Sequence, residues 1–197
     1  MSKIEMSRLR RLTESAILIA LTFVLHWVSQ VIPGMPQGGS VTLASLVPLL
    51  VISYRHGVKW GVFSATVFGI LRTMLSNNFA WVPATFWHFA GVALLDYIVA
   101  FGVIGLADLF RKPFRNDKYL GYAVSTIVVM FLRFVSHFVS GVLIWGSLAI
   151  EWGLRPAEQA AWIYSAIYNG SYMLPEASIA TVVILLMSKY VKFEKIK

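Results

Sequence analysis

Long, nearly continuous apolar runs dominate the chain, and short polar stretches separate them. Runs such as residues 17–28 and 126–135 lack the apolar–polar alternation that marks the strands of an outer-membrane barrel. Because about 20 apolar residues cross a bilayer as a helix, the chain has room for several passes. The pattern predicts an all-α integral membrane bundle of six transmembrane helices, forming one domain over residues 1–197, with spans at about 11–32, 40–54, 58–75, 86–110, 119–146 and 161–189.

The second predicted span differs from the others in being short and containing a proline, Pro48. A proline inside a helix removes a backbone hydrogen bond, so this span is expected to be tilted, kinked or only partly inserted. The preceding loop, residues 33–40, is rich in Pro and Gly, which exclude helix and allow close backbone approach. This composition suits a lid over an outward-facing pocket and suits an ordinary connection equally well.

The basic residues predict how the helices are oriented. Fourteen of the 17 Lys and Arg lie in four segments, 3–11, 55–59, 111–118 and 189–197. Six helices place all four segments on one side, which the positive-inside rule makes cytoplasmic. We therefore predict that both chain ends are inside, and that the topology, rather than a nucleic-acid partner, explains the net charge of +8.

Composition and missing motifs narrow the function. Apolar residues make up 58% of the chain and charged residues 13%, which is typical of membrane proteins. The absence of cysteine excludes disulfides, iron–sulfur clusters and thiol catalysis. The sequence also has no P-loop, His-Glu-x-x-His or Gly-x-Ser-x-Gly motif. We expect no metal and no cofactor, and uphill transport would need energy from a partner protein.

Polar and aromatic residues inside the spans are the strongest functional signal. An ionisable group there costs several kcal/mol unless it faces a partner, a cavity or a ligand. Interleaved with aromatics on three spans, such groups predict one shared pocket for a small, flat, cationic ligand. The candidate site residues are Asp96, Tyr97, Arg133, His137, Trp145, Tyr164 and Asn169.

Spacing supports a shared helix face for three of these residues. Arg133 and His137 are four residues apart, and Trp145 lies eight residues beyond His137, which is close to a whole number of turns. Each residue also has a structural interpretation on its own. Asp96 would form an ion pair with Arg133, His137 would be a core histidine, Trp145 would lie at the membrane interface, and Asn169 would link helices.

Other polar residues of the spans are interpreted structurally. His26, His56 and His88 have no stripe of polar neighbours, and Arg72 is placed to extend toward the headgroups. In the first span, Ala16 and Ala20 form a small-xxx-small pair that permits close helix approach. Packing within the chain and contact with a partner explain that pair equally well.

Four segments resemble the thiamine-specific substrate-binding subunits (S-components) of energy-coupling-factor transporters. They are residues 35–40 (Met-Pro-Gln-Gly-Gly-Ser), 95–101, 132–141 with Trp145, and 162–169. The resemblance implies that the seven candidate residues line a thiamine site. It also implies that Ala16 and Ala20 meet a transmembrane coupling subunit, that two ATPase subunits supply energy, and that the protein lies in a prokaryotic plasma membrane and is no enzyme. Some members of that family carry Glu in place of Asp96, Lys in place of Arg133, and a Trp in the first outer loop that this chain lacks.

Alternatives remain open at the level of sequence. Within the same class, the ligand would be another vitamin or a thiamine precursor. A small intramembrane enzyme would use His137 and Asp96 as acid and base, although such enzymes usually need more carboxylates than this chain has. An autonomous channel or facilitator would carry flux without any ATPase partner.

Overall fold

The computed structural model describes the chain except for residues 1–2, 36–37, 77–84, 115, 192 and 194–197. The described residues form helices and turns, and no strand occurs among them. The principal helices are α1 (Lys3–Val28), α2 (Val47–His56), α3 (Val58–Leu75), α4 (Phe86–Val92), α5 (Ala100–Gly102), α6 (Ala107–Arg111), α7 (Lys118–Ser140), α8 (Gly146–Glu151) and α9 (Ala161–Tyr190). Short 3-10 turns are η1 (Ser29–Val31), η5 (Val103–Leu106) and η6 (Lys112–Phe114), and two π-helical turns are η4 (Ala93–Val99) and η7 (Gly141–Trp145).

Within the described residues, five helical runs are long and apolar enough to cross a membrane. They are Ser7–Val31, Val58–Leu75, Phe86–Phe114, Lys118–Glu151 and Ala161–Tyr190. These runs confirm the all-α membrane class, and each overlaps one of the predicted spans. Several of them continue a few residues beyond the predicted limits, because the terminal turns of the helices extend into the polar flanks.

The remaining predicted span, residues 40–54, was wrong in its start and its length. Helix α2 begins at Val47 and has 10 residues, or about 15 Å, roughly half of the ~30 Å hydrocarbon core. Pro48 lies in its first turn, where its missing N–H needs no partner, so it starts the helix rather than kinking it. Residues 40–46 precede the helix as irregular backbone, which is tolerated at membrane depth where it is buried or lines a cavity.

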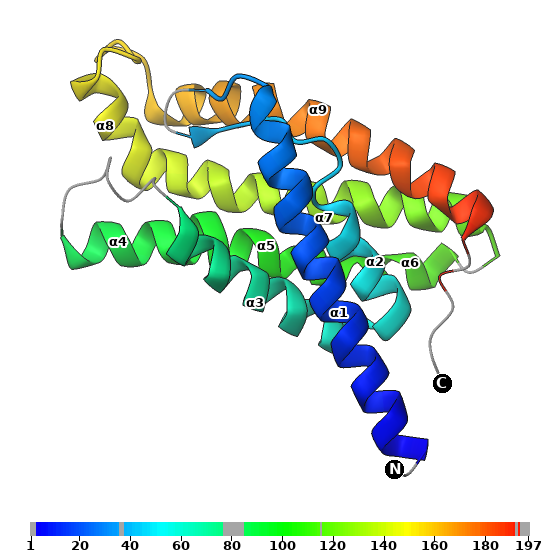
Figure 1. The fold of residues 1–197 in the computed structure, drawn as a ribbon. Coiled ribbons are helices and arrows are strands. Elements are labelled where there is room, and N and C mark those ends of the chain that lie inside the picture. Colours follow the sequence, from blue (N-terminus) through cyan, green and yellow to red (C-terminus); the bar gives the residue numbers. More distant parts are fainter. Residues whose placement is uncertain (1–2, 36–37, 77–84, 115, 192, 194–197) are drawn as a thin grey trace.

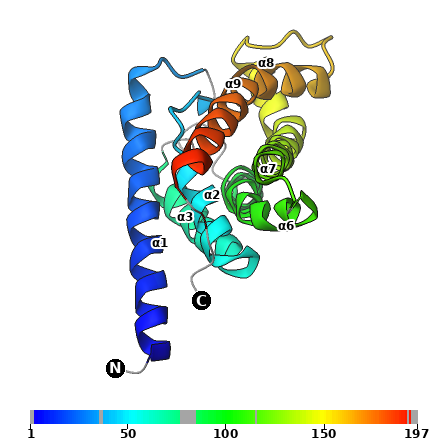
Figure 2. The same ribbon diagram turned by 90° about the vertical axis from the view of Figure 1, so that its right-hand side faces the viewer.

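The helices pack around α7. Helix α7 runs antiparallel to α9 on one side and to the α4–α6 run on the other (Figure 1). Helix α1 crosses the others steeply, lies on one flank of the bundle (Figure 2) and packs mainly on α2 and α3. Both Ala16 and Ala20 are exposed on α1, so these two side chains do not serve packing within the chain.

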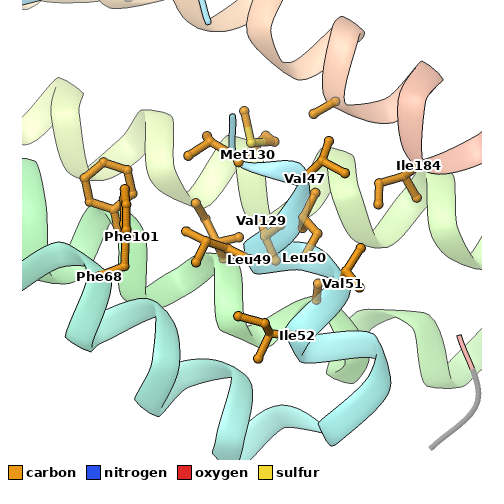
Figure 3. Close-up of a cluster of buried hydrophobic side chains, with 14 of the residues drawn as sticks. Val47, Leu49, Leu50, Val51, Ile52, Phe68, Phe101, Val129, Met130 and Ile184 are labelled. Carbon is orange, nitrogen blue, oxygen red and sulfur yellow. The ribbon is translucent and has the colours of Figure 1, made fainter. Parts of the chain in front are cut away.

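An apolar core fills the half of the bundle around α2. Leu49, Leu50 and Ile52 of α2 are fully buried in one cluster that also contains Val129 of α7 and Ile184 of α9 (Figure 3). Because lipid tails are as apolar as these side chains, close packing rather than exclusion of water stabilises such contacts in a membrane. The short helix α2 is therefore buried within the bundle, and it supports the irregular segment, residues 40–46, that precedes it.

Candidate functional site

One cavity brings all seven candidate residues together. It lies between α1, residues 38–46, α3, η4, α7 with η7, and α9, and its volume is about 100 Å³. Each residue predicted from the intramembrane polar pattern lines this cavity. The further polar or aromatic lining residues are His26, Ser40, Thr42, Ser45, Phe68, Arg72, Phe101, Ser165, Tyr168, Tyr172 and Glu176.

Asp96 accepts hydrogen bonds from three side chains of one helical run. His137 Nδ1 lies 3.0 Å from Oδ1, while the Ser140 hydroxyl and Trp145 Nε1 each donate to Oδ2 at 2.8 Å. The two π-helical turns η4 and η7 carry Asp96 and Trp145, and such turns often occur at functional sites. The carboxylate is therefore held by the wall of the cavity opposite its own helix.

The structural interpretation of Asp96 as the ion-pair partner of Arg133 was wrong. Arg133 Nη1 instead donates to Oε2 of Glu176 on α9 at 2.6 Å, and both side chains are buried. The other carboxylate oxygen of Glu176 accepts from the Thr42 hydroxyl. Arg133 lies one helical turn before His137 on the same face of α7, yet its side chain contacts α9 while that of His137 contacts Asp96. The Arg133 guanidinium also lies 5.3 Å from the centre of the Phe101 ring.

Glu176 was not among the predicted site residues, although the rule that found Asp96 applies to it. It is a carboxylate inside the last membrane-length run and is 2% exposed. Helix spacing also would have added Tyr172, because it continues the four-residue interval from Tyr164 through Tyr168. The three tyrosine rings follow one another along α9 with centres 5.8 Å apart.

The α9 wall is held by hydrogen bonds within the protein. Tyr172 donates to Asn169 Oδ1 at 2.8 Å, and Asn169 Nδ2 donates to the Ser165 carbonyl at 3.0 Å. Gly39 N–H donates to the Tyr168 hydroxyl at 2.9 Å, which joins the described end of loop 33–40 to α9. Pro36 and Gln37 of that loop lie outside the described residues, and both interpretations of the loop, a lid and an ordinary connection, stay open.

A second arginine lines the cavity from α3. Arg72 Nη2 lies 2.6 Å from Nε2 of His26 on α1, and the always protonated guanidinium makes His26 the acceptor. The sequence-based interpretation of Arg72 as a residue reaching the headgroups, and of His26 as merely structural, was therefore incomplete. Nearby, the Tyr97 hydroxyl is hydrogen-bonded to that of Ser76.

Two buried nitrogens of the cavity point to a ligand. Among the described residues, Arg133 Nε and His137 Nε2 are buried and have no hydrogen-bond partner. A buried polar atom left without a partner costs about 1–3 kcal/mol, so a ligand that pairs with these atoms would recover this energy. In the part of the chain that the structure describes, the cavity included, no group of three or more His, Cys, Asp or Glu side chains is arranged to hold a metal ion.

A family model assigns the chain. Residues 12–195 match the model of the thiamine transporter protein family (Thia_YuaJ). The chain belongs to this family. Curated relatives agree: the chain is 35% identical over 188 residues to the thiamine transporter ThiT of Bacillus subtilis, covering 91% of each protein. It is 28% identical over 178 residues to the ThiT of Lacticaseibacillus paracasei, covering 86% of this chain and 80% of that protein.

The fold agrees with that of a solved relative. A structure of ThiT from Listeria monocytogenes superposes with a TM-score of 0.71 over 95% of this chain and 98% of the other, at 23% identity. As a member of the thiamine transporter family with several membrane-length helices, the protein is a multi-pass protein of the bacterial cell membrane. Membership of a transport family also excludes the intramembrane enzyme that the sequence had left open.

Proposed function

We propose that this chain captures thiamine from outside the cell with high affinity and delivers it through an ATP-driven complex. The cavity carries the proposal, because it sets a buried carboxylate, Asp96, beside an indole, Trp145, within a membrane-embedded bundle. A permanent organic cation with flat rings is the kind of ligand that such a pair attracts. Thiamine, the substrate in the names of the curated relatives, has these properties.

The chemistry of thiamine matches the walls of the cavity. Its thiazolium ring is cationic, and an indole face such as that of Trp145 would contribute about 0.5–2 kcal/mol of cation–π attraction. The bond from Trp145 Nε1 to Asp96 fixes the indole and keeps the negative charge close to it. Tyr97, Tyr164 and Asn169 line the same cavity, and their hydroxyl and amide groups would hydrogen-bond the aminopyrimidine and the hydroxyethyl group.

Delivery requires partners in this proposal. The sequence contains no P-loop, so ATP hydrolysis would come from two ATPase subunits joined to a transmembrane coupling subunit. Ala16 and Ala20 are exposed on α1, and small side chains allow the close helix approach that a coupling subunit would need. We propose this face of α1 as the contact surface.

Titration of the purified, ligand-free protein with thiamine tests the capture step, with tryptophan fluorescence as the readout. We expect saturable quenching at submicromolar thiamine. Asp96→Ala and Trp145→Ala should each weaken binding by about 10- to 100-fold, because each breaks the hydrogen bond between the indole and the carboxylate. Asp96→Ala also removes a negative charge from the cavity wall, and Trp145→Ala removes an aromatic ring. Trp87→Ala is the matched control, because Trp87 is 80% exposed and does not line the cavity.

The outcomes separate the remaining alternatives. A folded protein that ignores thiamine would overturn the proposal, and saturable quenching by another vitamin or by a thiamine precursor would identify the ligand instead. Uptake by the chain alone in proteoliposomes, without ATPase subunits, would establish a facilitator and overturn the proposed ATP-driven delivery.

A further inference from the structure

Basic side chains gather at one corner of the bundle, where the N-terminal part of α1 meets the start of α3. Residues 8–15 and 55–60 together hold five Lys and Arg side chains but one carboxylate, Glu14. Glu14 forms an ion pair with Arg55, and its other carboxylate oxygen lies 3.5 Å from Nε2 of His56. In the described part of the chain, the remaining basic side chains of this corner form no ion pair with a carboxylate: Arg8, Arg10, Arg11 and Lys59. The corner therefore carries a surplus of positive charge.

An aromatic ring holds Arg11 in place at this corner. The Arg11 guanidinium lies over the Trp60 ring of α3, 4.4 Å from the ring centre, and Trp60 Nε1 donates to the Ser15 hydroxyl of α1 at 2.8 Å. Among the described residues, the buried Nε atom of Arg11 has no hydrogen-bond partner. Guanidinium N–H groups form a planar fork that matches a phosphate, and a fork that is already fixed loses little freedom on binding one. Arg11 is therefore prepared to bind a phosphate group.

The position of this corner in the membrane indicates where such a phosphate comes from. Arg11 lies near the start of the membrane-length run Ser7–Val31, and Trp60 lies near the start of the run Val58–Leu75. The positive-inside rule places both starts at the cytoplasmic leaflet, whose surface carries anionic lipids. One helical turn beyond Trp60, the Phe63 side chain is 56% exposed and packs on the Trp60 ring with ring centres 5.3 Å apart. A phosphate bound to Arg11 thus has an apolar surface beside it that fits an acyl chain.

We propose that Arg11, Trp60 and Phe63 form a binding site for one anionic phospholipid of the cytoplasmic leaflet. Arg11 binds the lipid phosphate, while Trp60 orients Arg11 and continues with Phe63 into a surface for the acyl chain. Arg8, one turn before Arg11, and Lys59, next to Trp60, are exposed and add positive charge around the headgroup. Because the lipid contacts both helices, it holds the cytoplasmic part of α1 against α3. None of the three site residues lines the central cavity.

The experiment compares phosphatidylglycerol with phosphatidylcholine of the same acyl chains, each added to the purified full chain in detergent. Native mass spectrometry counts the bound lipids. We expect one phosphatidylglycerol per chain, bound about 10-fold more tightly than phosphatidylcholine, because the net negative headgroup meets the surplus positive charge. Phosphatidylglycerol should also raise the unfolding temperature, as a ligand of the folded state does. Glycerol phosphate, which has the charged group without acyl chains, should neither displace the lipid nor raise that temperature at the same concentration.

Substitutions of single basic residues separate this site from the general positive charge of the cytoplasmic side. Arg11→Gln should weaken phosphatidylglycerol by about 10-fold, the effect of losing charged hydrogen bonds to the phosphate. Arg11→Lys keeps the charge but lacks the planar fork, and should weaken it by about threefold. Lys112→Gln is the matched control, because Lys112 is exposed in η6, outside this corner, and its loss also removes one positive charge. It should change lipid affinity by less than about twofold.

Three results would overturn this lipid site. Equal affinities for the two lipids would remove the preference for an anionic headgroup. Equal losses in Arg11→Gln and Lys112→Gln would show that diffuse charge, rather than a site, attracts the lipid. Displacement by glycerol phosphate would show a site for a soluble anion instead. Unfolding without lipid shows that each variant is folded, and none of these measurements involves thiamine, so their outcome is independent of the proposed function.

Discussion

The two halves of the bundle use the same helices for opposite purposes. In the half around the cavity, α7 and α9 contribute a buried ion pair, Arg133 with Glu176, at an N–O distance of 2.6 Å. In the other half, the same two helices contribute Val129 and Ile184, which have no exposed surface, to an apolar core. Only one helical turn of α7 separates Val129 from Arg133. Ligand binding and packing should therefore be separable by substitution.

Breaking the ion pair should have the largest effect. Glu176→Ala leaves the Arg133 cation buried without a carboxylate, which typically costs about 3–5 kcal/mol of unfolding free energy. Thermal unfolding in detergent measures the loss, and thiamine titration should show that binding is abolished.

A double variant sharpens the same comparison. Arg133→Met with Glu176→Leu replaces the pair by apolar side chains and makes the cavity resemble the apolar half. Stability should recover most of the loss, because no charge remains buried, whereas binding should stay absent. A double variant that binds thiamine normally would contradict the role of the pair in the site.

A cavity created in the apolar half should have the opposite pattern of effects, lowering stability while leaving thiamine affinity nearly unchanged. Leu50→Ala removes a fully buried side chain of α2 and should lower the unfolding free energy by about 2–5 kcal/mol. The thiamine affinity of the folded protein should remain within about threefold of the natural value, an energy difference below 1 kcal/mol. A much larger loss of affinity in a folded variant would mean that α2 supports the site directly.

The contact between η7 and α9 beside the cavity allows a smaller test. A Cβ added at Gly141 would collide with the Ser165 side chain and lie 3.2 Å from Asn169 Nδ2. Gly141→Ala should therefore push the two walls apart, lowering stability by about 1–3 kcal/mol and weakening thiamine. Gly170→Ala on α9 is the control, since nothing lies within 4 Å of its added Cβ. Equal effects of the two substitutions would rule out the close approach as the cause.

The exposed face of α1 should show the smallest effect on the isolated chain. Ala16→Leu and Ala20→Leu add bulk outside both halves of the bundle, so unfolding and thiamine binding should change by less than about 0.5 kcal/mol. Transport by the assembled complex should fall, because larger side chains prevent close helix approach. Normal uptake by both variants would place the partner surface elsewhere.

Sequence reasoning predicted which residues share the cavity better than it predicted their partners. The cost of polar groups in a bilayer identified Asp96, Arg133 and His137 without any model of the fold. The pairing of Asp96 with Trp145 involves the π-helical turns η4 and η7, which change helix register and have no signature in the hydrophobic pattern. Regular helical spacing therefore could not predict which residues of the run formed by α7 and η7 contact Asp96.

The region around α2 was predicted least accurately, for a related reason. Apolar composition at residues 40–54 suggested a spanning helix, but the pattern does not distinguish burial in protein from exposure to lipid. Burial in the bundle allows α2 to be short, and the polar side chains of residues 40–46 find partners such as Glu176. Likewise, His26 and Arg72 enter the cavity only because α1 and α3 meet at that end.

The bridge formed by Thr42, Arg133 and Glu176 has a consequence for natural variation. Glu176 serves both partners at once, one from the segment before α2 and one from α7. A change at any one of the three positions alters the hydrogen-bonding demand on the other two. Across the thiamine transporter family, these positions should co-vary as a set of three, whereas Asp96 should co-vary with His137 and Ser140 in a separate set.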